Sequence, residues 1–374
     1  MKYKYGIIGA GMQGTAAGYW LAKQEDTLSV EFYDIDEAKS ETAAKRINNL
    51  LNGTKCKKQT SSNDMWENVN AVLGCANYWY NEKFSECATL YKTHFNDLGG
   101  NTDIVKKQLG FHHQAMDAGI SIVPDCGLAP GMANTLAKWC MDKMINGASH
   151  VEIRVGGLPQ NKNCNFLGYK KLFNLHGLTN EYSGQATAIK NGEIVHINTL
   201  SHMEPVQVQN LNLFADVTSG GTSTCCESFL KNDLDTYNYK TLRWSPMHWY
   251  HMRGYKEIGL FKNRELFHPM LDKIIDMPDE KDMTVMSIKC WADECEPYIC
   301  EQHCNISLID KHDDETGFSS MERTTGFSAA IVTAMQARGQ VKPGAVPLEL
   351  SVNSEIFMKE ATKEFDFKVE SNVL

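Results

Sequence analysis

Short apolar runs alternate, over the first third of the chain, with longer segments whose apolar residues recur at helical spacing. The runs lie at residues 5–8, 28–33, 71–76, 94–98 and 120–123, and the helical segments at 15–24, 43–51, 83–91 and 104–118. A short apolar run predicts a buried strand, and a period of about 3.6 residues predicts a helix. Strands that alternate with helices in this way predict a parallel, doubly wound α/β sheet.

A glycine-rich turn joins the first strand to the first helix, with the sequence Gly9-Ala10-Gly11-Met12-Gln13-Gly14. Three glycines at this spacing allow a tight turn, close approach of the backbone to a pyrophosphate, and close packing of helix on strand. The N-terminus of the helix then faces the phosphates. We therefore interpret Gly9, Gly11 and Gly14, with Met12 and Gln13 between them, as a dinucleotide-binding loop.

An acidic residue 20 positions beyond Gly14 (34 − 14) supports the same interpretation. At the end of the second strand, the carboxylate of Asp34 can accept a hydrogen bond from a ribose 2′-hydroxyl and repel a 2′-phosphate, which favours NAD over NADP. Asp36 is a second candidate for the ribose contact. Because ligands bind at the carboxyl ends of parallel strands, Cys75 and Asn77 are also expected beside the cofactor.

Composition excludes several classes of partner. The chain has 374 residues with 37 basic and 46 acidic side chains and a net charge of −9, so nucleic acid is not expected as a partner. No apolar run approaches the ~18 to 20 residues that a bilayer span needs, so no membrane role is expected. The first strand follows Met1 too closely for a signal peptide, which predicts a cytoplasmic protein with reduced thiols.

Twelve cysteines raise the question of a metal site. The densest group also contains His303 and comprises Cys290, Cys295, Cys300 and Cys304. Its spacing lacks the paired C-x2-C knuckles of structural zinc sites. Residues 286–310 instead predict two strands joined near 296–297, with the last two cysteines of the group on one face. We therefore expect buried thiols and no bound metal.

Five segments resemble, in the same order, motifs of the saccharopine dehydrogenase-like family. They are residues 96–100 (NDLGG), 124–132 (PDCGLAPGM), 155–159 (VGGLP), 218–224 (TSGGTST) and 239–243 (YKTLR). The resemblance is strongest to the L-lysine 6-dehydrogenase branch. It implies a Rossmann domain at 1–131, an α+β substrate and dimerisation domain with a mixed sheet at 132–323, and a helical segment at 324–374 that returns to the Rossmann domain.

For function, the resemblance implies an NAD-dependent enzyme that removes a hydride from the ε-carbon of L-lysine. The resulting imine would hydrolyse to 2-aminoadipate 6-semialdehyde, which cyclises to piperideine-6-carboxylate, and ammonia. Homodimers or higher homo-oligomers are also implied. After residue 243 the chain departs from the lysine dehydrogenase pattern, so another amino acid or the secondary amine of a saccharopine-type reductase stays open as the substrate. A dinucleotide-binding protein without catalysis is the third alternative.

The chemistry of an amino-acid dehydrogenase selects the candidate site residues. A substrate carboxylate requires an arginine fork, and Arg243 is the first candidate, with Arg154 in reserve. The amine must lose a proton before its carbon gives up a hydride, so a nearby carboxylate or imidazole is required.

The candidates for this proton acceptor are Asp97, Asp125, His176 and Glu204. Asp97 and Asp125 could instead cap the turns that follow them. The predicted substrate contacts are completed by Thr241, Glu204, Tyr78 and Gly100.

Overall fold

The computed structural model describes residues 1–144, 147–232, 234–292 and 302–373. It divides the chain into two compact units, one formed by Met1–Thr135 and Glu322–Lys363 and the other by Leu136–Met321 and Glu364–Leu374. The boundaries expected at residues 131 and 323 lie close to these. The third expected segment differs, because only its part up to Lys363 belongs to the first unit.

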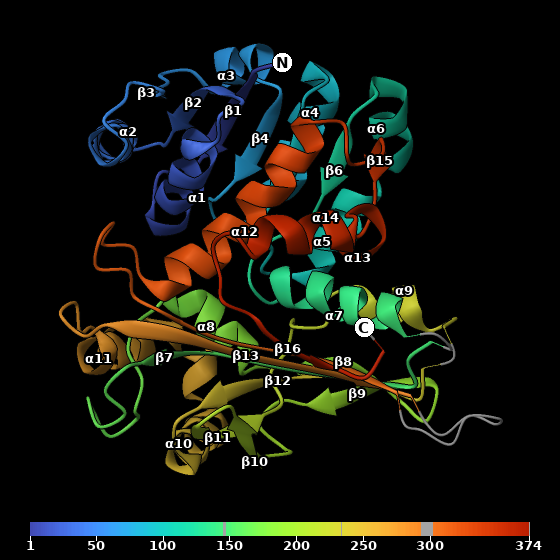
Figure 1. Cartoon of the computed structure of the whole chain (residues 1–374). Coiled ribbons are helices and arrows are strands. Elements are labelled where there is room, and N and C mark those ends of the chain that lie inside the picture. Colours follow the sequence, from blue (N-terminus) through green and yellow to red (C-terminus); the bar gives the residue numbers. More distant parts are fainter. Residues whose placement is uncertain (145–146, 233, 293–301, 374) are drawn as a thin grey trace. The chain divides into compact units, whose positions relative to one another are not determined.

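The first unit contains a parallel seven-stranded sheet of order β15-β6-β5-β4-β1-β2-β3 (Figure 1). Its strands are β1 (Tyr3–Ile8), β2 (Thr27–Tyr33), β3 (Cys56–Lys58), β4 (Ala71–Gly74), β5 (His94–Asp97), β6 (Ser121–Val123) and β15 (Gly344–Ala345). Each pairing is parallel. The predicted doubly wound sheet is therefore confirmed.

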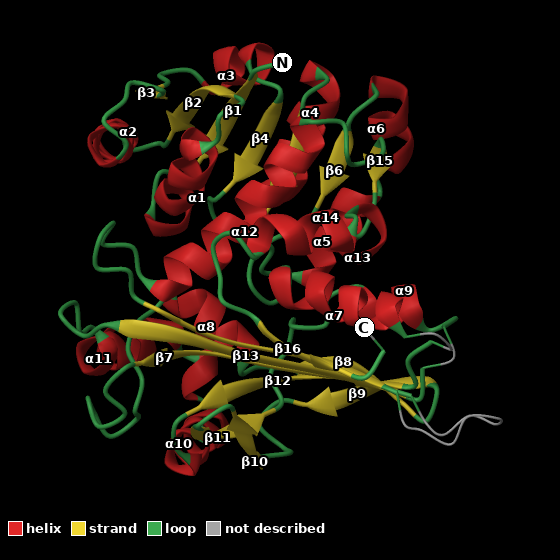
Figure 2. Cartoon of the chain, in the orientation of Figure 1, coloured by secondary structure: helices red, strands yellow, loops and turns green. Residues whose placement is uncertain are grey.

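Helices cover both faces of this sheet (Figure 2). The helices of this unit are α1 (Met12–Lys23), α2 (Glu37–Leu50), α3 (Ser62–Asn68), η1 (Tyr78–Tyr80), α4 (Asn81–Tyr91), α5 (Thr102–Leu109), α6 (His112–Ala118), α13 (Leu348–Ser351) and α14 (Ser354–Ala361). Two further helices, α7 (Met132–Lys143) and α12 (Ser320–Ala337), pass from one unit to the other. The single helix expected at 104–118 is divided, because α5 ends at Leu109 with Gly110 as its C-cap and α6 begins at His112.

Apolar side chains of three helices fill one face of the first sheet. Trp66 of α3, Ala88 of α4 and Ala115 of α6 pack in one buried cluster with Val72 of β4 and Phe95 of β5. Burial of apolar side chains on both faces of a parallel sheet gives the strands their nearly continuous apolar runs. This explains why the runs at 71–76 and 94–98 are recognisable in the sequence.

The second unit contains a mixed nine-stranded sheet. Its strands are β7 (His150–Pro159), β8 (Gln185–Lys190), β9 (Glu193–Asn198), β10 (Glu204–Val208), β11 (Leu211–Asp216), β12 (Thr236–Arg243), β13 (Asp282–Trp291), β14 (His303–Lys311) and β16 (Lys368–Ser371). Its helices are α8 (Leu175–Glu181), α9 (Cys225–Phe229), α10 (Pro246–Glu257), η2 (Leu260–Lys262) and α11 (Arg264–Ile275). The predicted mixed sheet is confirmed.

Strand pairing explains the path of the last residues. The main order is β10-β11-β12-β7-β13-β14-β16, in which β12 and β7 are parallel and the other neighbours are antiparallel. β16 hydrogen-bonds to β14, which joins the end of the chain to the second unit. The sequence did not predict this strand, because its alternation is too short to signal a strand.

Cysteine placement follows the predicted strands in part. Cys290 of β13 and Cys304 of β14 are buried and lie directly opposite each other in the antiparallel register. Cys295, Cys300 and the expected turn near 296–297 lie outside the described residues. The ten cysteines of the described residues are free thiols. Within the same residues, no helix combines the length and the apolar character that crossing a bilayer requires.

Candidate functional site

The loop of residues 9–14, called the glycine loop below, closes tightly against the end of β4. Gly9 has φ +100°, and a Cβ there would lie 2.7 Å from the carbonyl carbon of Cys75. A Cβ on Gly14 would lie 2.0 Å from the carbonyl oxygen of Gly9. Both contacts are shorter than any real Cβ makes, so the turn requires glycine at both positions. The structure thereby brings Cys75 against the loop.

Gly11 differs from its two neighbours because it faces open space. A Cβ added to Gly11 would meet no atom within 4 Å, and this residue is the N-cap of α1 without a side-chain cap. The N–H groups of the first helical turn, which includes Met12 and Gln13, are thus left for an outside acceptor. An uncapped helix N-terminus beside an open backbone cradle fits the pyrophosphate of a dinucleotide.

Asp34 lies beside this cradle, whereas Asp36 has a different role. The Oδ2 atom of Asp34 accepts the N–H of Ala10 at 2.8 Å, and its Oδ1 atom accepts the N–H of Asp36 at 2.9 Å. These two bonds fix the orientation of the carboxylate next to the loop. The side chain of Asp36 caps α2 by accepting the N–H of Ala38 at 3.1 Å. The geometry therefore favours Asp34 over Asp36 for the ribose contact.

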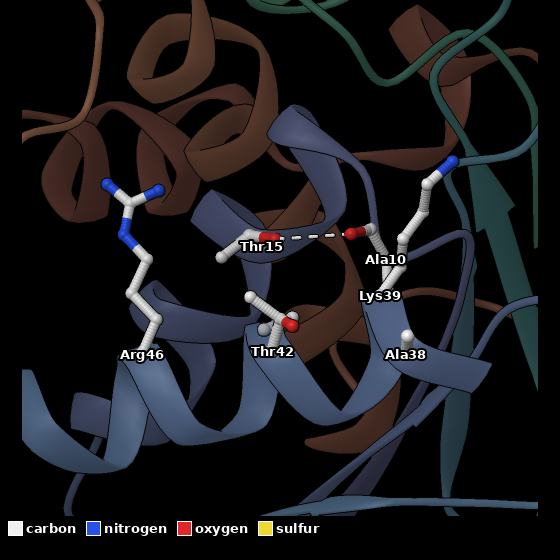
Figure 3. A pocket seen from close by; sticks show the side chains of 7 residues that line it. Ala10, Thr15, Ala38, Lys39, Thr42 and Arg46 are labelled. Atoms are coloured by element: carbon white, nitrogen blue, oxygen red, sulfur yellow. Dashed lines mark hydrogen bonds between the residues drawn. The ribbon is translucent and has the colours of Figure 1, made fainter. Parts of the chain in front are cut away.

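A pocket of about 250 Å³ begins at Ala10 and extends between α1 and α2 (Figure 3). It is lined by Ala10, Thr15, Ala38, Lys39, Thr42, Ala43 and Arg46. Lys39, Thr42, Ala43 and Arg46 are at positions i, i+3, i+4 and i+7 of α2, which lie on one face of a helix. Figure 3 shows Lys39 and Arg46 at opposite ends of the pocket with Thr42 between them. The sequence analysis missed this pocket, although the spacing on α2 is its signal.

Asp97 at the end of β5 is fully buried and makes the contacts of a turn-capping residue. Its Oδ1 atom accepts the N–H of Gly99 at 2.7 Å, and its Oδ2 atom accepts a side-chain N–H of Gln108 at 2.7 Å. Burial raises the pKa of Asp97 to about 6, although these hydrogen bonds favour the ionised form. The geometry supports the capping alternative for this residue.

Asp125 after β6 has an unusual backbone conformation, with φ +64°. Its carboxylate lies so close to Gly99 that a Cβ on that glycine would be 2.0 Å from Oδ1. The neighbouring Gly100 has φ +126° and lies against the ring of Tyr78. A Cβ on Gly100 would be 3.1 Å from the Cδ1 atom of that ring. The structure thus brings together four of the predicted residues of the first unit, while Asn77 lies exposed at the start of η1.

In the second unit, Arg243 is 2% exposed and is held on several sides. Its Nε and Nη2 atoms donate to the hydroxyl of Tyr182 at 3.2 and 2.7 Å, and Nη1 donates to the carbonyl of Leu242 at 2.8 Å. Its guanidinium carbon lies 4.7 Å from the ring centre of Tyr169 and 5.6 Å from that of Trp249. Aromatic faces and hydroxyl oxygens therefore compensate this buried cation.

These contacts leave one edge of the Arg243 guanidinium unused. A guanidinium has five N–H groups, and Tyr182 takes the pair on the Nε edge while Leu242 takes one from Nη1. One N–H on each terminal nitrogen remains, which is the end-on fork that binds a carboxylate in bidentate fashion. No carboxylate of the described residues forms an ion pair with Arg243.

His248 of α10 completes the support of this arginine. Its Nδ1 atom lies 3.1 Å from the carbonyl of Leu167, and its Nε2 atom lies 3.0 Å from the hydroxyl of Tyr182. The carbonyl can only accept, so Nδ1 carries the proton and Nε2 accepts from Tyr182. Burial holds the pKa of His248 well below its usual value, with the charge of Arg243 acting in the same direction. This histidine is therefore neutral and structural.

Glu181 at the end of α8 is a titratable residue that the sequence analysis did not single out. Its side chain is half-buried, and burial raises its pKa to about 7 while the positive charge of Arg243 limits the rise. The only sequence signal was its position next to Tyr182, in a segment between two motifs.

The other predicted residues of the second unit are distributed around this cluster. Thr241 belongs to it, since its hydroxyl lies 2.7 Å from that of Thr218 and 3.3 Å from that of Tyr239. His176 is exposed at the opposite end of α8 from Glu181 and packs on His268, with ring centres 4.7 Å apart.

Glu204 and Arg154 are already paired with each other. The Nε atom of Arg154 donates to Oε1 of Glu204 at 2.7 Å, and Lys240 donates to the other oxygen of the same carboxylate. Arg154 also donates to the side-chain oxygen of Asn238 at 2.7 Å. Arg154 therefore lacks the open fork of Arg243, and the Glu204 carboxylate is neutralised by two cations.

A family model for the saccharopine dehydrogenase C-terminal domain matches residues 127–366, more than half of the chain. The chain belongs to the saccharopine dehydrogenase family. A saccharopine dehydrogenase (L-Glu forming) of Saccharomyces cerevisiae has a similar fold, with a TM-score of 0.78, 17% sequence identity and 99% of each chain covered.

A homospermidine synthase of Legionella pneumophila, solved in complex with NAD, is also similar. Its TM-score is 0.68 at 10% sequence identity, and the likeness covers 100% of this chain and 92% of that chain. Identities this low establish a common fold for this member of the saccharopine dehydrogenase family. The site residues must be judged by their own geometry.

Proposed function

We propose that the chain is an NAD-dependent dehydrogenase that oxidises a carbon–nitrogen bond of an amino acid, with the ε-amine of L-lysine as its first-choice substrate. The cofactor half of the proposal is supported by the open backbone cradle at Gly11, the uncapped N-terminus of α1 and the fixed carboxylate of Asp34. Family membership supports the reaction class, and the NAD complex of the Legionella homospermidine synthase is consistent with the cofactor.

The observation that carries the substrate half is the open fork of Arg243. A buried cation without an ion-pair partner is costly, and an α-carboxylate would complete its two remaining hydrogen bonds. Such a contact is worth more in a buried site than at the surface, because charge-assisted bidentate bonds form without competing water. A substrate that carries both a carboxylate and an amine satisfies this requirement.

The reaction balances without a metal ion. The substrate ammonium first gives up a proton, and the carbon next to it then gives up a hydride, for which a bound NAD would supply the acceptor. The nitrogen lone pair becomes the second bond of the imine, and water then releases the aldehyde and ammonia. The contributions of this chain are to hold the carboxylate at Arg243, to orient the carbon and to accept the proton.

The test is NADH formation at alkaline pH with L-lysine, L-ornithine, meso-diaminopimelate and saccharopine as separate substrates. The proposal expects turnover with L-lysine and an aldehyde product that an aldehyde-trapping reagent detects. Arg243→Lys should raise the KM of the carboxylate substrate strongly and leave the Kd of NAD unchanged. Turnover of saccharopine alone would instead identify a saccharopine-type enzyme, and NAD binding without any turnover would identify a non-catalytic protein.

A further inference from the structure

The hydrogen bonds that hold Arg243 continue beyond Tyr182 to two further residues. The hydroxyl of Tyr182 accepts N–H groups from Nη2 and Nε of Arg243 at 2.7 and 3.2 Å. The Nε2 atom of His248 lies 3.0 Å from the same hydroxyl, and its Nδ1 atom lies 3.1 Å from the carbonyl oxygen of Leu167. The four groups therefore form one chain of hydrogen bonds that runs from the guanidinium to a backbone carbonyl.

The two ends of this chain fix the direction of every bond in it. A guanidinium only donates, and a carbonyl only accepts. The Nδ1 atom of His248 therefore carries the ring proton, and its Nε2 atom accepts the one proton of the Tyr182 hydroxyl. Both lone pairs of the hydroxyl oxygen then remain for the two N–H groups of Arg243. The acceptor at Nε2 is thus what allows Tyr182 to accept twice from the arginine.

The carbonyl end of the chain is anchored by Asn165. Its Oδ1 atom accepts the N–H of Leu167 at 3.0 Å, and its Nδ2 atom donates to the carbonyls of Tyr169 at 2.7 Å and Ile274 at 3.2 Å. Ile274 belongs to α11, so the segment 165–169 is tied to a helix. The same segment supplies the ring of Tyr169, whose centre lies 4.7 Å from the guanidinium carbon of Arg243. One anchored segment thus fixes both the end of the chain and an aromatic face of the arginine.

Packing holds the imidazole of His248 in this position. The side chains of His248 and Tyr182 are 0% exposed, so water does not compete for their hydrogen bond. The imidazole makes edge contacts with the rings of Tyr169 and Trp249, with ring centres 5.5 and 5.1 Å apart. A buried hydroxyl that loses its acceptor has to turn its proton elsewhere. Because the N–H groups of Arg243 occupy the other positions around this oxygen, the arginine would then lose part of its support.

We propose that His248 is a positioning residue that sets the affinity of the site for a substrate carboxylate. It acts through Tyr182, because its Nε2 atom takes the hydroxyl proton and leaves the oxygen free to orient Arg243. This inference rests on the proposed function, in which Arg243 binds the carboxylate, and adds the residue on which the orientation of the arginine depends. Its effect falls on binding of the carboxylate and not on the hydride step.

The first experiment compares His248→Asn with His248→Gln, because each amide keeps one half of the imidazole. The Asn nitrogen lies near the position of Nδ1 and can still donate to Leu167, but the side chain is too short to accept from Tyr182. The Gln oxygen lies near the position of Nε2 and can still accept from Tyr182. His248→Asn should raise the KM of L-lysine by about tenfold or more with little change in kcat, and His248→Gln should restore most of the affinity.

Two comparisons show whether the loss concerns the carboxylate. The diamine 1,5-diaminopentane lacks a carboxylate, so His248→Asn should hardly change its KM. His196→Asn alters an exposed histidine on β9 and should match the wild type with both amines. Equal losses with the two amines, or equal losses in the Asn and Gln variants of His248, would overturn its positioning role.

The second experiment is a double-mutant cycle with Tyr182→Phe. If His248 acts through the hydroxyl of Tyr182, His248→Asn should raise the KM of L-lysine much less in the Phe variant than in the wild type, since the shared bond is already absent. Independent losses that multiply would contradict the inference. The Tm and the Kd of NAD report on folding, and if His248→Asn does not fold, a KM for His248→Gln as high as that for Arg243→Lys refutes the acceptor role.

These experiments separate the inference from the function on which it rests. If the wild type is active and Arg243→Lys raises the KM while His248→Asn leaves it unchanged, the function stands and the role of His248 is refuted. If the wild type forms no NADH with any amine, the proposed function fails. The same variants are then compared by the calorimetric Kd of L-norleucine, a carboxylate probe that needs no turnover, and absence of its binding to the wild type would refute both proposals.

Discussion

The hydroxyl of Tyr182 accepts two N–H groups of Arg243, from Nη2 at 2.7 Å and from Nε at 3.2 Å. This shared acceptor holds the guanidinium so that one N–H on each terminal nitrogen remains available as an end-on fork. Tyr182→Phe should therefore raise the KM of L-lysine, since the arginine loses its orientation and a buried unpaired donor costs about 1–3 kcal/mol. A carboxylate-free analogue, 1,5-diaminopentane, should be affected much less.

Steady-state kinetics with both amines checks this prediction, and the Kd of NAD should stay unchanged. Tyr250→Phe removes a hydroxyl from a side chain that is 51% exposed and is the matched control. An equal loss of kcat/KM for both amines would show that Tyr182 does not act through the carboxylate contact.

The glycine loop offers a test that separates folding from cofactor binding. Gly14→Ala should lower the Tm, because its Cβ would lie 2.0 Å from the carbonyl oxygen of Gly9. Gly11→Ala should leave the Tm nearly unchanged, because its Cβ meets no atom within 4 Å. The same variant should nevertheless bind NAD more weakly. Thermal unfolding and equilibrium titration with NAD distinguish the two effects. Unaltered NAD affinity in the Gly11 variant would show that this loop does not bind the phosphates of NAD.

Cofactor preference should depend on Asp34 and on the pocket between α1 and α2. Asp34→Ser removes the negative charge next to Ala10, so the ratio of NAD to NADP affinity should fall by about tenfold or more. Lys39 at one end of the pocket should then attract the 2′-phosphate. Adding Lys39→Ala to the Ser variant should reverse much of the gain in NADP affinity, and a double variant that still binds NADP as tightly would contradict this role of Lys39.

The pH dependence of stability should contain a contribution from Asp97. Its pKa is about 6 in the folded protein, against an ordinary aspartate value of 3.8, so between these values the folded state binds more protons than the unfolded state. The free energy of unfolding should then fall as pH rises through this interval, by about 3 kcal/mol in total. Asp97→Asn should lack this slope.

Urea unfolding of both proteins from pH 4 to 8 measures this difference. The Asn variant also loses a hydrogen-bond acceptor, which shifts its whole curve downward without producing a slope. The exposed Asp117 on α6 supplies the control, because Asp117→Asn should keep the wild-type pH dependence. Parallel curves for the wild type and the Asp97 variant would mean that folding does not raise the pKa of this carboxyl group.

The sequence predicted those features that depend on local patterns. The apolar runs, the spacing of Gly9, Gly11 and Gly14, and the acid at position 34 each follow from the backbone needs of one strand–turn–helix unit. The parallel sheet could therefore be deduced before the structure. The mixed sheet and the approximate unit boundaries came instead from the resemblance to a family.

Features that depend on distant packing were not predictable in this way. Nothing in the local sequence shows that Tyr182 binds Arg243, because that contact depends on how the end of α8 packs near β12. The same limit explains why Glu204 seemed available in the sequence although Arg154 neutralises it. Burial and pairing, which decide the chemistry of a carboxylate, are properties of the folded unit rather than of the motif.

The chain passes between the two units three times, after Thr135, after Met321 and after Lys363. The seven-stranded sheet needs β15, and the second sheet needs β16, which is made later still. During synthesis the glycine loop therefore emerges first, but its own sheet gains its last edge strand only after most of the second unit has been translated. A nascent chain therefore carries an incomplete seven-stranded sheet for most of the translation of these residues, and no single proteolytic cut can release either unit whole.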